Sequence, residues 1–288
     1  MARRKPPTVH GVAVVDKPAG VTSHDVVVML RRRFGERRIG HAGTLDPGAT
    51  GVLVVGVGNV TRLLRFITEG RKRYTGEVVL GVETDSLDAD GAVVATHPVG
   101  DVDLDEVRRV VAEHFTGEIE QVPPMVSALK VGGRRLHELA REGVEVARES
   151  RPVTVHSFEV TGMHGEVVSI EVECSAGTYI RSLAADLGRA LGCGAHLRNL
   201  RRTAVLPFTI DEAAPPDECE LLPVIEAVRA LPRVVVDDTL AARVADGAVL
   251  AAPGDNGPWA LVTAPGELLA VYQRHRNGTA KPAVVLHQ

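Results

Sequence analysis

The sequence predicts an α+β fold with a mixed, largely antiparallel central sheet flanked by helices, followed by a small C-terminal β-barrel. Helix-like segments stand between strand pairs instead of alternating regularly with single strands, which favours this class over a doubly wound sheet. A Pro-rich stretch at 213–223 precedes short strand-like segments separated by Gly and Pro. We therefore expect a basic tail at 1–10, a large domain at 11–231 and a small domain at 232–288.

The first hundred residues predict strand, helix, strand and hairpin in that order. Residues 11–20 form an apolar run that ends in a Pro-Gly turn, and residues 22–34 predict a helix with Thr22 or Ser23 as its N-cap. The apolar run GVLVVGVG at 51–58 predicts a buried strand. Two strand-like segments joined by the polar SLDAD predict a hairpin over 74–99.

The second part predicts two longer helices around a long hairpin. Residues 103–115 have helical spacing, and residues 182–192 predict a second helix. The face expected to be buried in the first of these helices consists of Val107, Val110, Val111 and His114. Period-two alternation around a His-Gly turn predicts an antiparallel hairpin over 151–177, and residues 223–232 predict a short helix. The segment at about 123–152, which contains Pro-Pro and Gly-Gly pairs, reads as an insertion that stands off the core.

Charge and cysteine content limit the class of protein. The net charge of −4 argues against a globally basic nucleic-acid protein, so an RNA partner would need local patches. Two basic runs, at 31–38 and 62–74, could supply them, although each could equally be a solvated face. The three cysteines lie far apart, and no apolar run approaches the ~20 residues of a membrane span. We expect no metal site, no membrane contact and a cytoplasmic location.

One carboxylate has an unusual setting. In GHAGTLDPGATGVLVVGVG, residues 40–58, Asp46 lies between glycines and ahead of an apolar strand. Glycine permits positive φ and close approach of the backbone to a ligand. A carboxylate becomes a nucleophile when a fixed cation orients it. The segment CSAGTYIRSLAADLG offers Tyr179 and Arg181 where a strand meets a helix, and Tyr74 beside a basic run suits stacking on an exposed base.

Three other motifs resemble sites for different chemistry, but each departs from the pattern which that chemistry needs. GVGNVT at 56–61 lacks the third glycine of a dinucleotide fingerprint, and GHAGTLDPGATG lacks the Gly-Lys-Ser/Thr ending of a P-loop. DADG at 88–91 resembles the aspartate pair of dehalogenase-type phosphatases, but its polar surroundings predict a hairpin loop. Cofactor-dependent and nucleoside triphosphate chemistry are therefore not supported.

Five segments together carry a family resemblance: DKPAGVTSHDVV, GHAGTLDPGATGVL, KRYTGEVVLG with TDSLDADG, PPMVSALKVGGRRLHELAREG and CSAGTYIRSLAADLGRALGCGAHLRNLRRT. In this order, over residues 11–208, they resemble the bacterial tRNA pseudouridine-55 synthase (TruB) family. The terminal segment resembles a PUA RNA-binding domain more weakly. The resemblance implies a pseudouridine synthase fold, an RNA-binding insertion, a PUA-like domain at 232–288 and a monomer.

The resemblance also implies roles for individual residues. Asp46 is the expected catalytic carboxylate, Arg181 its ion-pair partner, and Tyr74 the residue that stacks on the base and assists proton removal from carbon 5. Tyr179 shapes the pocket, and His41 occupies the space of the flipped nucleotide. The further expected substrate or RNA contacts are Gly43, Thr44, Lys130, Arg134 and Arg202.

The implied reaction converts U55 in the T stem-loop of tRNA to pseudouridine by base flipping, without a cofactor. Whether Asp46 attacks the base, attacks the sugar or assists elimination stays open at this level. Two other classes stay open as well: a non-catalytic RNA-binding protein or RNA chaperone on the same scaffold, and an aspartyl-phosphate phosphotransferase that would need Mg²⁺. Lys17 is expected to have a structural role in holding the first turn.

Overall fold

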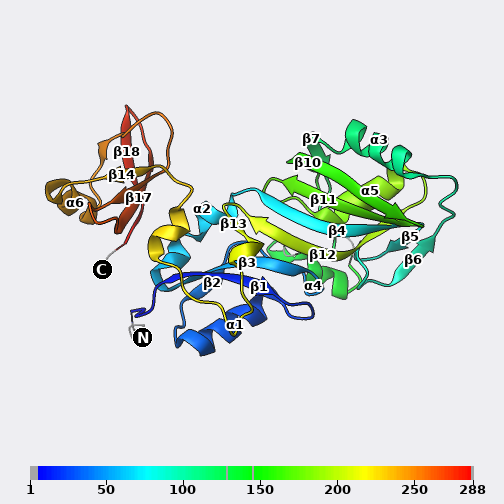
Figure 1. Ribbon diagram of the computed structural model, residues 1–288, viewed down its shortest axis with the longest axis horizontal. Coiled ribbons are helices and arrows are strands. Elements are labelled where there is room, and N and C mark those ends of the chain that lie inside the picture. The colour runs from blue at the N-terminus through cyan, green and yellow to red at the C-terminus, as the bar shows by residue number, and fades with distance from the viewer. Residues whose placement is uncertain (1–5, 128, 145, 287–288) are drawn as a thin grey trace.

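A large sheet forms the body of the protein. The structure is a computed structural model that describes residues 6–127, 129–144 and 146–286. Within these residues nine strands form one sheet in the order β1-β3-β12-β4-β11-β10-β7, with β2 beside β3 and β13 beside β12 (Figure 1). The strands are β1 Gly11–Lys17, β2 Ile39–His41, β3 Thr50–Val57, β4 Lys72–Leu80, β7 Gly117–Gln121, β10 Arg151–His164, β11 Val167–Cys174, β12 Ala195–Val205 and β13 Phe208–Thr209. Every pairing is antiparallel except that of β3 with β12, so the predicted mixed, largely antiparallel sheet is confirmed.

Helices cover the two halves of this sheet separately. α1 packs on β1 and β3, whereas α3 and α5 pack on β4, β10, β11 and β12 (Figure 1). The α-helices are α1 Ser23–Phe34, α2 Leu64–Thr68, α3 Leu104–His114, α4 Leu136–Arg141, α5 Ile180–Ala190 and α6 Asp238–Ala245. The 3₁₀ helices are η1 Gly58–Arg62, η2 Ile210–Glu212 and η3 Val224–Val228. The two halves meet at β3 and β12, near the middle of the sheet.

Local signals place the helix boundaries. Thr22 caps α1 in a capping box with Asp25, and Gly35 ends the helix with a positive φ. Asp103 caps α3 by accepting a hydrogen bond from the backbone N–H of Glu106. These caps confirm the predicted helix starts, because they depend only on residues within one turn.

Three predicted elements differ from the structure. The hairpin expected over 74–99 is present but shorter: the chain breaks at Gly81, so β4 joins the large sheet, while β5 Val82–Thr84 and β6 Val93–Thr96 pair antiparallel across the predicted polar loop. The buried face of α3 contains the three predicted valines but not His114, whose side chain is 63% exposed. The helix expected at 223–232 is only the 3₁₀ helix η3, which has Pro223 as its N-cap.

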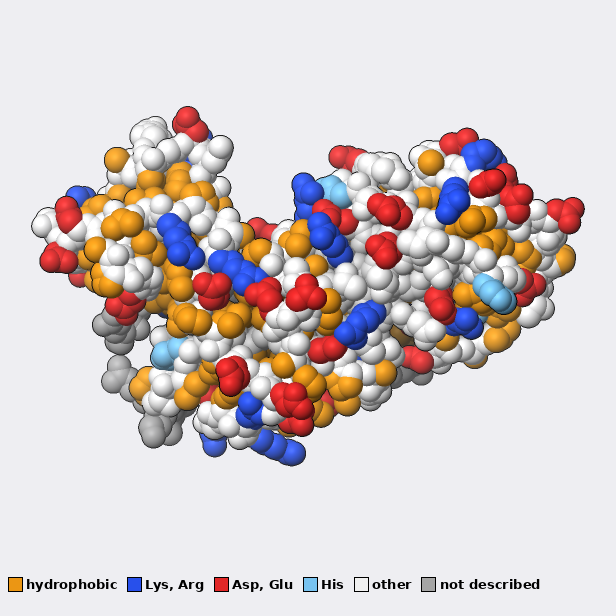
Figure 2. Space-filling view, viewed as in Figure 1, with side chains coloured by type: hydrophobic (Ala, Val, Ile, Leu, Met, Phe, Trp, Pro, Cys, Tyr) orange, Lys and Arg blue, Asp and Glu red, His pale blue; other side chains and the backbone are white. Residues whose placement is uncertain are grey.

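A second sheet follows the large one. Within the described residues its strands are β14 Arg233–Val235, β15 Leu250–Ala251, β16 Trp259–Val262, β17 Leu268–Arg274 and β18 Thr279–Val285. They pair in the order β14-β16-β17-β18-β15 as a curled half-barrel, which agrees with the predicted small β-structure. One face packs with α6 around Trp259 and Tyr272, and the other continues the core formed around α2 and β13. Figure 2 shows this sheet as a lobe separated from the body by a notch.

A short hairpin and a helix connect β7 with β10. The hairpin consists of β8 Lys130–Val131 and β9 Arg134–Arg135, and α4 follows directly. Among the described residues, no helix combines the length and apolar character needed to cross a membrane.

Candidate active site

The site lies where the two halves of the sheet meet. The parallel pairing of β3 with β12 places Gly51 opposite Arg202. Gly51 has φ +99°, and a Cβ there would lie 2.2 Å from the Arg202 carbonyl oxygen, so only glycine permits this approach. The loop of residues 42–49, which we call the Asp46 loop, enters β3 at this point and therefore faces β4 and the start of α5.

Two polar side chains, Lys17 at the end of β1 and Ser23 at the start of α1, hold the Asp46 loop. Ser23 Oγ accepts a hydrogen bond from Leu45 N at 2.8 Å and donates to Leu45 O at 3.1 Å. Lys17 is fully buried, and its Nζ donates to three backbone carbonyls, including that of Pro47 at 3.0 Å. Burial lowers the pKa of Lys17 to about 8. The expected structural role of Lys17 is confirmed.

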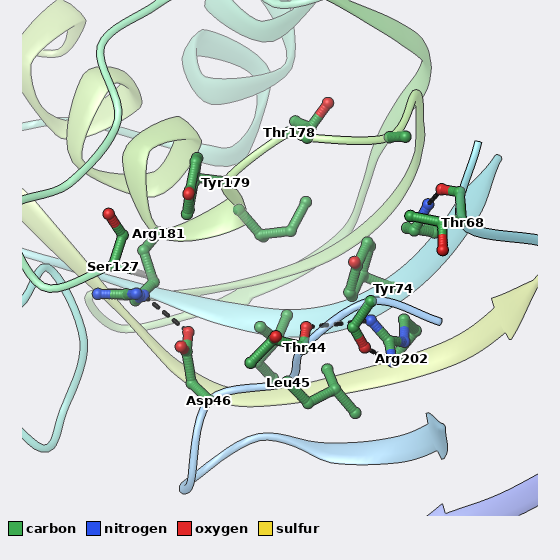
Figure 3. Close-up of a pocket in the computed structure, with 16 residues that line it drawn as sticks. Thr44, Leu45, Asp46, Thr68, Tyr74, Ser127, Thr178, Tyr179, Arg181 and Arg202 are labelled. Carbon is green, nitrogen blue, oxygen red and sulfur yellow. Dashed lines mark hydrogen bonds and ion pairs between the residues drawn. The ribbon is translucent and has the colours of Figure 1, made fainter. Parts of the chain in front are cut away.

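An ion pair fixes the carboxylate of Asp46. Arg181 Nε lies 2.9 Å from Asp46 Oδ2 and 3.5 Å from Asp88 Oδ2, so one guanidinium bridges two carboxylates (Figure 3). Its two terminal nitrogens donate to the carbonyls of Ser86, at 2.6 Å, and Val126, at 2.8 Å. The Arg181 side chain is 4% exposed, whereas that of Asp46 is 41% exposed toward the cavity. The arginine is therefore immobilised and the carboxylate stays accessible.

The electrostatic surroundings of Asp46 act in opposite directions. Burial raises its pKa above the ordinary value, and the Asp88 carboxylate raises it further. The Arg181 guanidinium and the Lys17 ammonium lower the pKa, because both favour the charged form. The net shift is upward, so the acid–base equilibrium of Asp46 lies closer to neutral pH than that of a solvated aspartate.

A cavity of about 270 Å³ opens above this ion pair. Tyr74, from β4, lines the cavity and is 8% exposed. Burial raises the pKa of Tyr74, while the Arg202 guanidinium opposes that shift. In Figure 3 Asp46 and Arg181 point toward each other, and Tyr74 lies beyond Thr44 on the other side of the loop. The remaining lining residues include Gly43, Thr44, Leu45, Lys72, Ser127, Thr178, Tyr179, Leu200 and Arg202.

The start of α5 is held by an amide side chain. Tyr179 is the N-cap of this helix, and its backbone N–H donates to Gln121 Oε1 at 2.7 Å. Gln121 Nε2 donates in return to the Tyr179 carbonyl at 3.0 Å. This pair of hydrogen bonds fixes the first turn of α5, which carries Arg181, relative to β7.

Two family models match adjoining parts of the chain. One, described as TruB family pseudouridylate synthase (N terminal domain), matches residues 31–180, and the other, tRNA pseudouridylate synthase B C-terminal domain, matches residues 181–220. The chain belongs to the TruB family. The predicted resemblance, and the expectation of an enzyme of this family, are thereby confirmed.

Relatives and solved structures agree with this membership. The chain is 46% identical to tRNA pseudouridine synthase B of Thermobifida fusca, over 96% of this chain and 98% of the relative. It is 45% identical to the protein of the same name from Aromatoleum aromaticum, over 95% and 92%. A chain in the crystal structure of a Cbf5-Nop10-Gar1 complex matches with a TM-score of 0.72 and 30% identity, over 93% of this chain and 79% of that chain. A chain in the structure of an H/ACA RNP bound to a substrate RNA containing 2'-deoxyuridine matches with a TM-score of 0.68 and 29% identity, over 91% and 77%.

The structure brings most of the predicted site residues of this TruB family member to one place. Asp46, Tyr74, Tyr179 and Arg181 line the same cavity. Gly43 and Thr44 line it as well. His41 lies outside the cavity lining, half-buried at the end of β2, and burial lowers its pKa.

Two predicted RNA contacts lie in the segment between β7 and β10. Arg134 is exposed and forms an ion pair with Glu142. The backbone of Lys130 belongs to β8, but its side chain lies outside what the structure describes. Arg134 is therefore available at the surface, with part of its charge balanced within the protein.

Arg202 lines the cavity but is almost completely buried. Its residue surface is 1% exposed, and its guanidinium donates to backbone carbonyls of β3 and the Asp46 loop. The expected substrate or RNA contact of Arg202 stays a prediction, and its hydrogen bonds within the protein give it a structural role as well. The parallel pairing of β12 with β3 turns this side chain inward.

Sequence reasoning missed Asp88 and Lys72. Asp88 lies in the DADG segment, which does form the predicted loop between β5 and β6, yet its carboxylate also faces Arg181. Lys72 is 6% exposed, lines the cavity and donates to the carbonyls of Thr68 and Gly70, each at 2.8 Å. Burial lowers its pKa to about 8. The DADG motif was a usable signal for Asp88, whereas Lys72 was hidden within a basic run. Among the described residues, no group of three His, Cys, Asp or Glu side chains could hold a metal ion.

Proposed function

We propose that this protein converts U55 in the T stem-loop of tRNA to pseudouridine, by base flipping and without a cofactor. The observation that carries the proposal is the Asp46–Arg181 ion pair, 2.9 Å long, at a cavity that also contains Tyr74. Membership of the TruB family supports it, since the relatives named above are tRNA pseudouridine synthases B.

The reaction is an isomerisation of one nucleotide. The bond between ribose C1′ and uracil N1 breaks, the base turns, and a bond between C1′ and C5 forms. The C5 proton leaves to solvent, and N1 ends with a proton. Atoms and charge balance without an oxidant, a reductant or a second substrate.

Each residue of the site has a task in this proposal. Asp46 supplies the reacting carboxylate, and its exposed fraction of 41% lets it reach a nucleotide in the cavity. Arg181 holds the carboxylate in one orientation and favours its ionised form. Asp88 contacts the same guanidinium and helps to orient it. Tyr74 presents an aromatic ring on which a base can stack, next to the position of C5.

The size of the cavity supports base flipping. About 270 Å³ is slightly below the usual range of about 300–1,000 Å³ for ligand pockets, so the cavity suits a single extruded nucleotide and excludes a duplex. Extrusion costs a few kcal/mol of unstacking. The structural relative with a bound substrate RNA is consistent with an RNA substrate for this fold.

Further parts of the proposal concern the whole molecule. We infer that residues 232–288 form a PUA-like RNA-binding domain, separate from the tail at 1–10 and the catalytic domain at 11–231. The half-barrel has its own core, and it exposes Arg233, Arg276 and Lys281. We also expect a monomer in the cytoplasm, with the T stem-loop as its RNA partner.

Tritium release tests the reaction directly. A tRNA stem-loop labelled with ³H at C5 of U55 alone should lose its label to water in the presence of EDTA and without nucleotide. Asp46→Asn is the negative control. A protein that only binds RNA or assists its folding would bind the stem-loop and release nothing. A phosphotransferase would leave the label in place and require Mg²⁺.

A further inference from the structure

Arg202 is one of the largest fully buried side chains of the protein. Within the described residues no carboxylate lies within ion-pair distance of it. Burying a cation without such a partner costs free energy, because the cation loses its hydration and the protein interior solvates it less well. Hydrogen bonds from Arg202 to the surrounding backbone carbonyls must therefore offset this cost. These carbonyls also show which part of the backbone the side chain holds in place.

Its contacts converge on the Asp46 loop. Nε donates to the carbonyl of Val52 at 2.7 Å, Nη2 to that of Gly43 at 3.1 Å and Nη1 to that of Thr44 at 3.3 Å. Gly43 has φ +92°, so the chain turns at this position. The planar guanidinium presents its N–H donors in a fixed fork, so it holds these three carbonyls in one arrangement, whereas the donors of an ammonium converge on a single nitrogen. Arg202 thus fixes the backbone two and three residues before Asp46.

The same side chain also reaches Tyr74. Arg202 and Tyr74 are opposite residues in the pairing of β12 with β4. The positive charge of the Arg202 guanidinium favours the ionised form of the Tyr74 phenol and so opposes the upward pKa shift that burial causes. In Figure 3 Tyr74 and Arg202 lie to the right of Thr44, whereas Arg181 lies to its left. One buried cation therefore joins the two elements that carry the carboxylate and the aromatic ring.

We propose that Arg202 is a positioning residue that sets the Asp46 loop and the Tyr74 ring in one arrangement, and so controls turnover and not RNA affinity. This inference rests on the proposed function. Lys17 and Ser23 hold the other end of the loop, so loss of the Arg202 fork leaves the loop attached but displaced.

The decisive variant is Arg202→Lys, with Arg201→Lys as its matched control. Arg201 is the preceding residue on β12, is partly exposed and pairs with Asp16 at 2.7 Å, away from the cavity. With saturating enzyme, Arg202→Lys should lower the single-turnover rate about 100-fold, the effect of a displacement near 1 Å at a reacting group. RNA affinity should stay within about threefold, equivalent to ~0.7 kcal/mol. The control should match the wild-type protein in both.

A spectroscopic readout separates positioning from general stability. The chain has three tyrosines, so ¹³Cζ-tyrosine labelling gives three resonances, from Tyr74, Tyr179 and Tyr272. Arg202→Lys should shift the Tyr74 resonance. That of Tyr272, whose hydroxyl donates to Ala248 in the half-barrel, should not move. Arg201→Lys should move neither.

Each outcome decides the proposal. A wild-type single-turnover rate in folded Arg202→Lys, an unmoved Tyr74 resonance, or a loss that lies mainly in RNA affinity would overturn it. If Arg202→Lys does not fold, Arg202→Gln takes its place, and failure of both to fold would assign Arg202 to stability alone, against the proposal. If the wild-type protein itself forms no pseudouridine, the proposed function fails, while the resonances still test whether Arg202 positions Tyr74.

Discussion

The buried cations near the Asp46 loop and the arginines of the two basic runs differ in what surrounds them. Lys17, Lys72, Arg181 and Arg202 are all at most 6% exposed. Each donates to backbone carbonyls, and among these four only Arg181 also contacts carboxylates. Their positive charge therefore stabilises the backbone of loops near the cavity.

The two basic runs also differ from each other in the contacts that their arginines make. In the run at 62–74, Arg62 donates to the carbonyl of Val285 at 2.6 Å, and Arg65 contacts Gln273 at 3.1 Å, so both reach the half-barrel. Arg71 and Arg73 both pair with Glu173. All four of these arginines are exposed, and so are Arg32, Arg33, Arg37 and Arg38 in the run at 31–38, but among the described residues the latter form no ion pair. Figure 2 shows Lys and Arg side chains projecting over α1 at the lower edge of the molecule.

Arginines that are neighbours in the sequence therefore need not share a structural or functional role. We expect buried cations to affect turnover at unchanged affinity, the run at 62–74 to affect stability, and the run at 31–38 to affect affinity for an anionic partner. Variants of each class sharpen or break this division.

Asp46→Asn should have the largest effect. It keeps the shape of the side chain but removes the charge that Arg181 holds, together with nearly all nucleophilicity. Pseudouridine formation should fall below detection, while RNA binding stays within about tenfold, or ~1.4 kcal/mol. Single-turnover assays with saturating enzyme measure the first and filter binding the second. A substantial rate in this variant would remove Asp46 from the chemistry.

Arg181→Lys should be the next most severe change. A lysine keeps the charge but lacks the fork that reaches Asp46, Ser86 and Val126 at once, so we expect a loss of about 100-fold or more in single-turnover rate. The control is Arg189→Lys on the exposed face of the same helix, where the arginine pairs with Asp186. Equal rates in the two variants would show that the fork geometry does not matter.

The pH dependence tests the electrostatics around Asp46. Asp46 must be ionised to act, and its pKa is raised, so the rate should fall with decreasing pH at values above the ordinary aspartate pKa of about 3.9. Asp88→Asn removes one of the charges that raise this pKa, so the acid limb should move to lower pH. Asp90→Asn, in the same loop, serves as the control in pH profiles of the single-turnover rate. An upward shift in Asp88→Asn would reverse the assigned sign.

The surface arginines should give the smallest effects. Those of the run at 31–38 should change the salt dependence of RNA binding, and those of the run at 62–74 should change stability. Removing both Arg32 and Arg33 should lower the slope of log affinity against log salt by roughly 1.4–1.8, since each phosphate contact contributes ~0.7–0.9. Arg62→Ala should leave that slope unchanged and lower the free energy of unfolding by at most about 1 kcal/mol, because it loses one hydrogen bond to the half-barrel. Salt titrations of RNA binding and thermal melts measure the two. A reduced slope in Arg62→Ala would break the division between the runs.

The sequence by itself determined the elements and residues that depend on near neighbours. The capping box of Thr22 with Asp25, the three valines of α3 and the β10–β11 hairpin follow from spacing within one turn or one strand pair. Asp46, Tyr74 and Arg181 could be named as site residues because their motifs carry a family resemblance. The α+β class followed from the order of these local elements.

Only the tertiary structure decided which distant residues meet. The Arg202 contact with Val52 spans 150 positions in the chain, and that of Arg181 with Ser86 spans 95. The parallel pairing of β3 with β12 turns Arg202 inward, and the half-barrel engages Arg62. Hydrophobic spacing specifies which face of a segment is buried, but not which other segment covers it. The role of a charged side chain depends on that partner segment, and the two come into contact only in the folded chain.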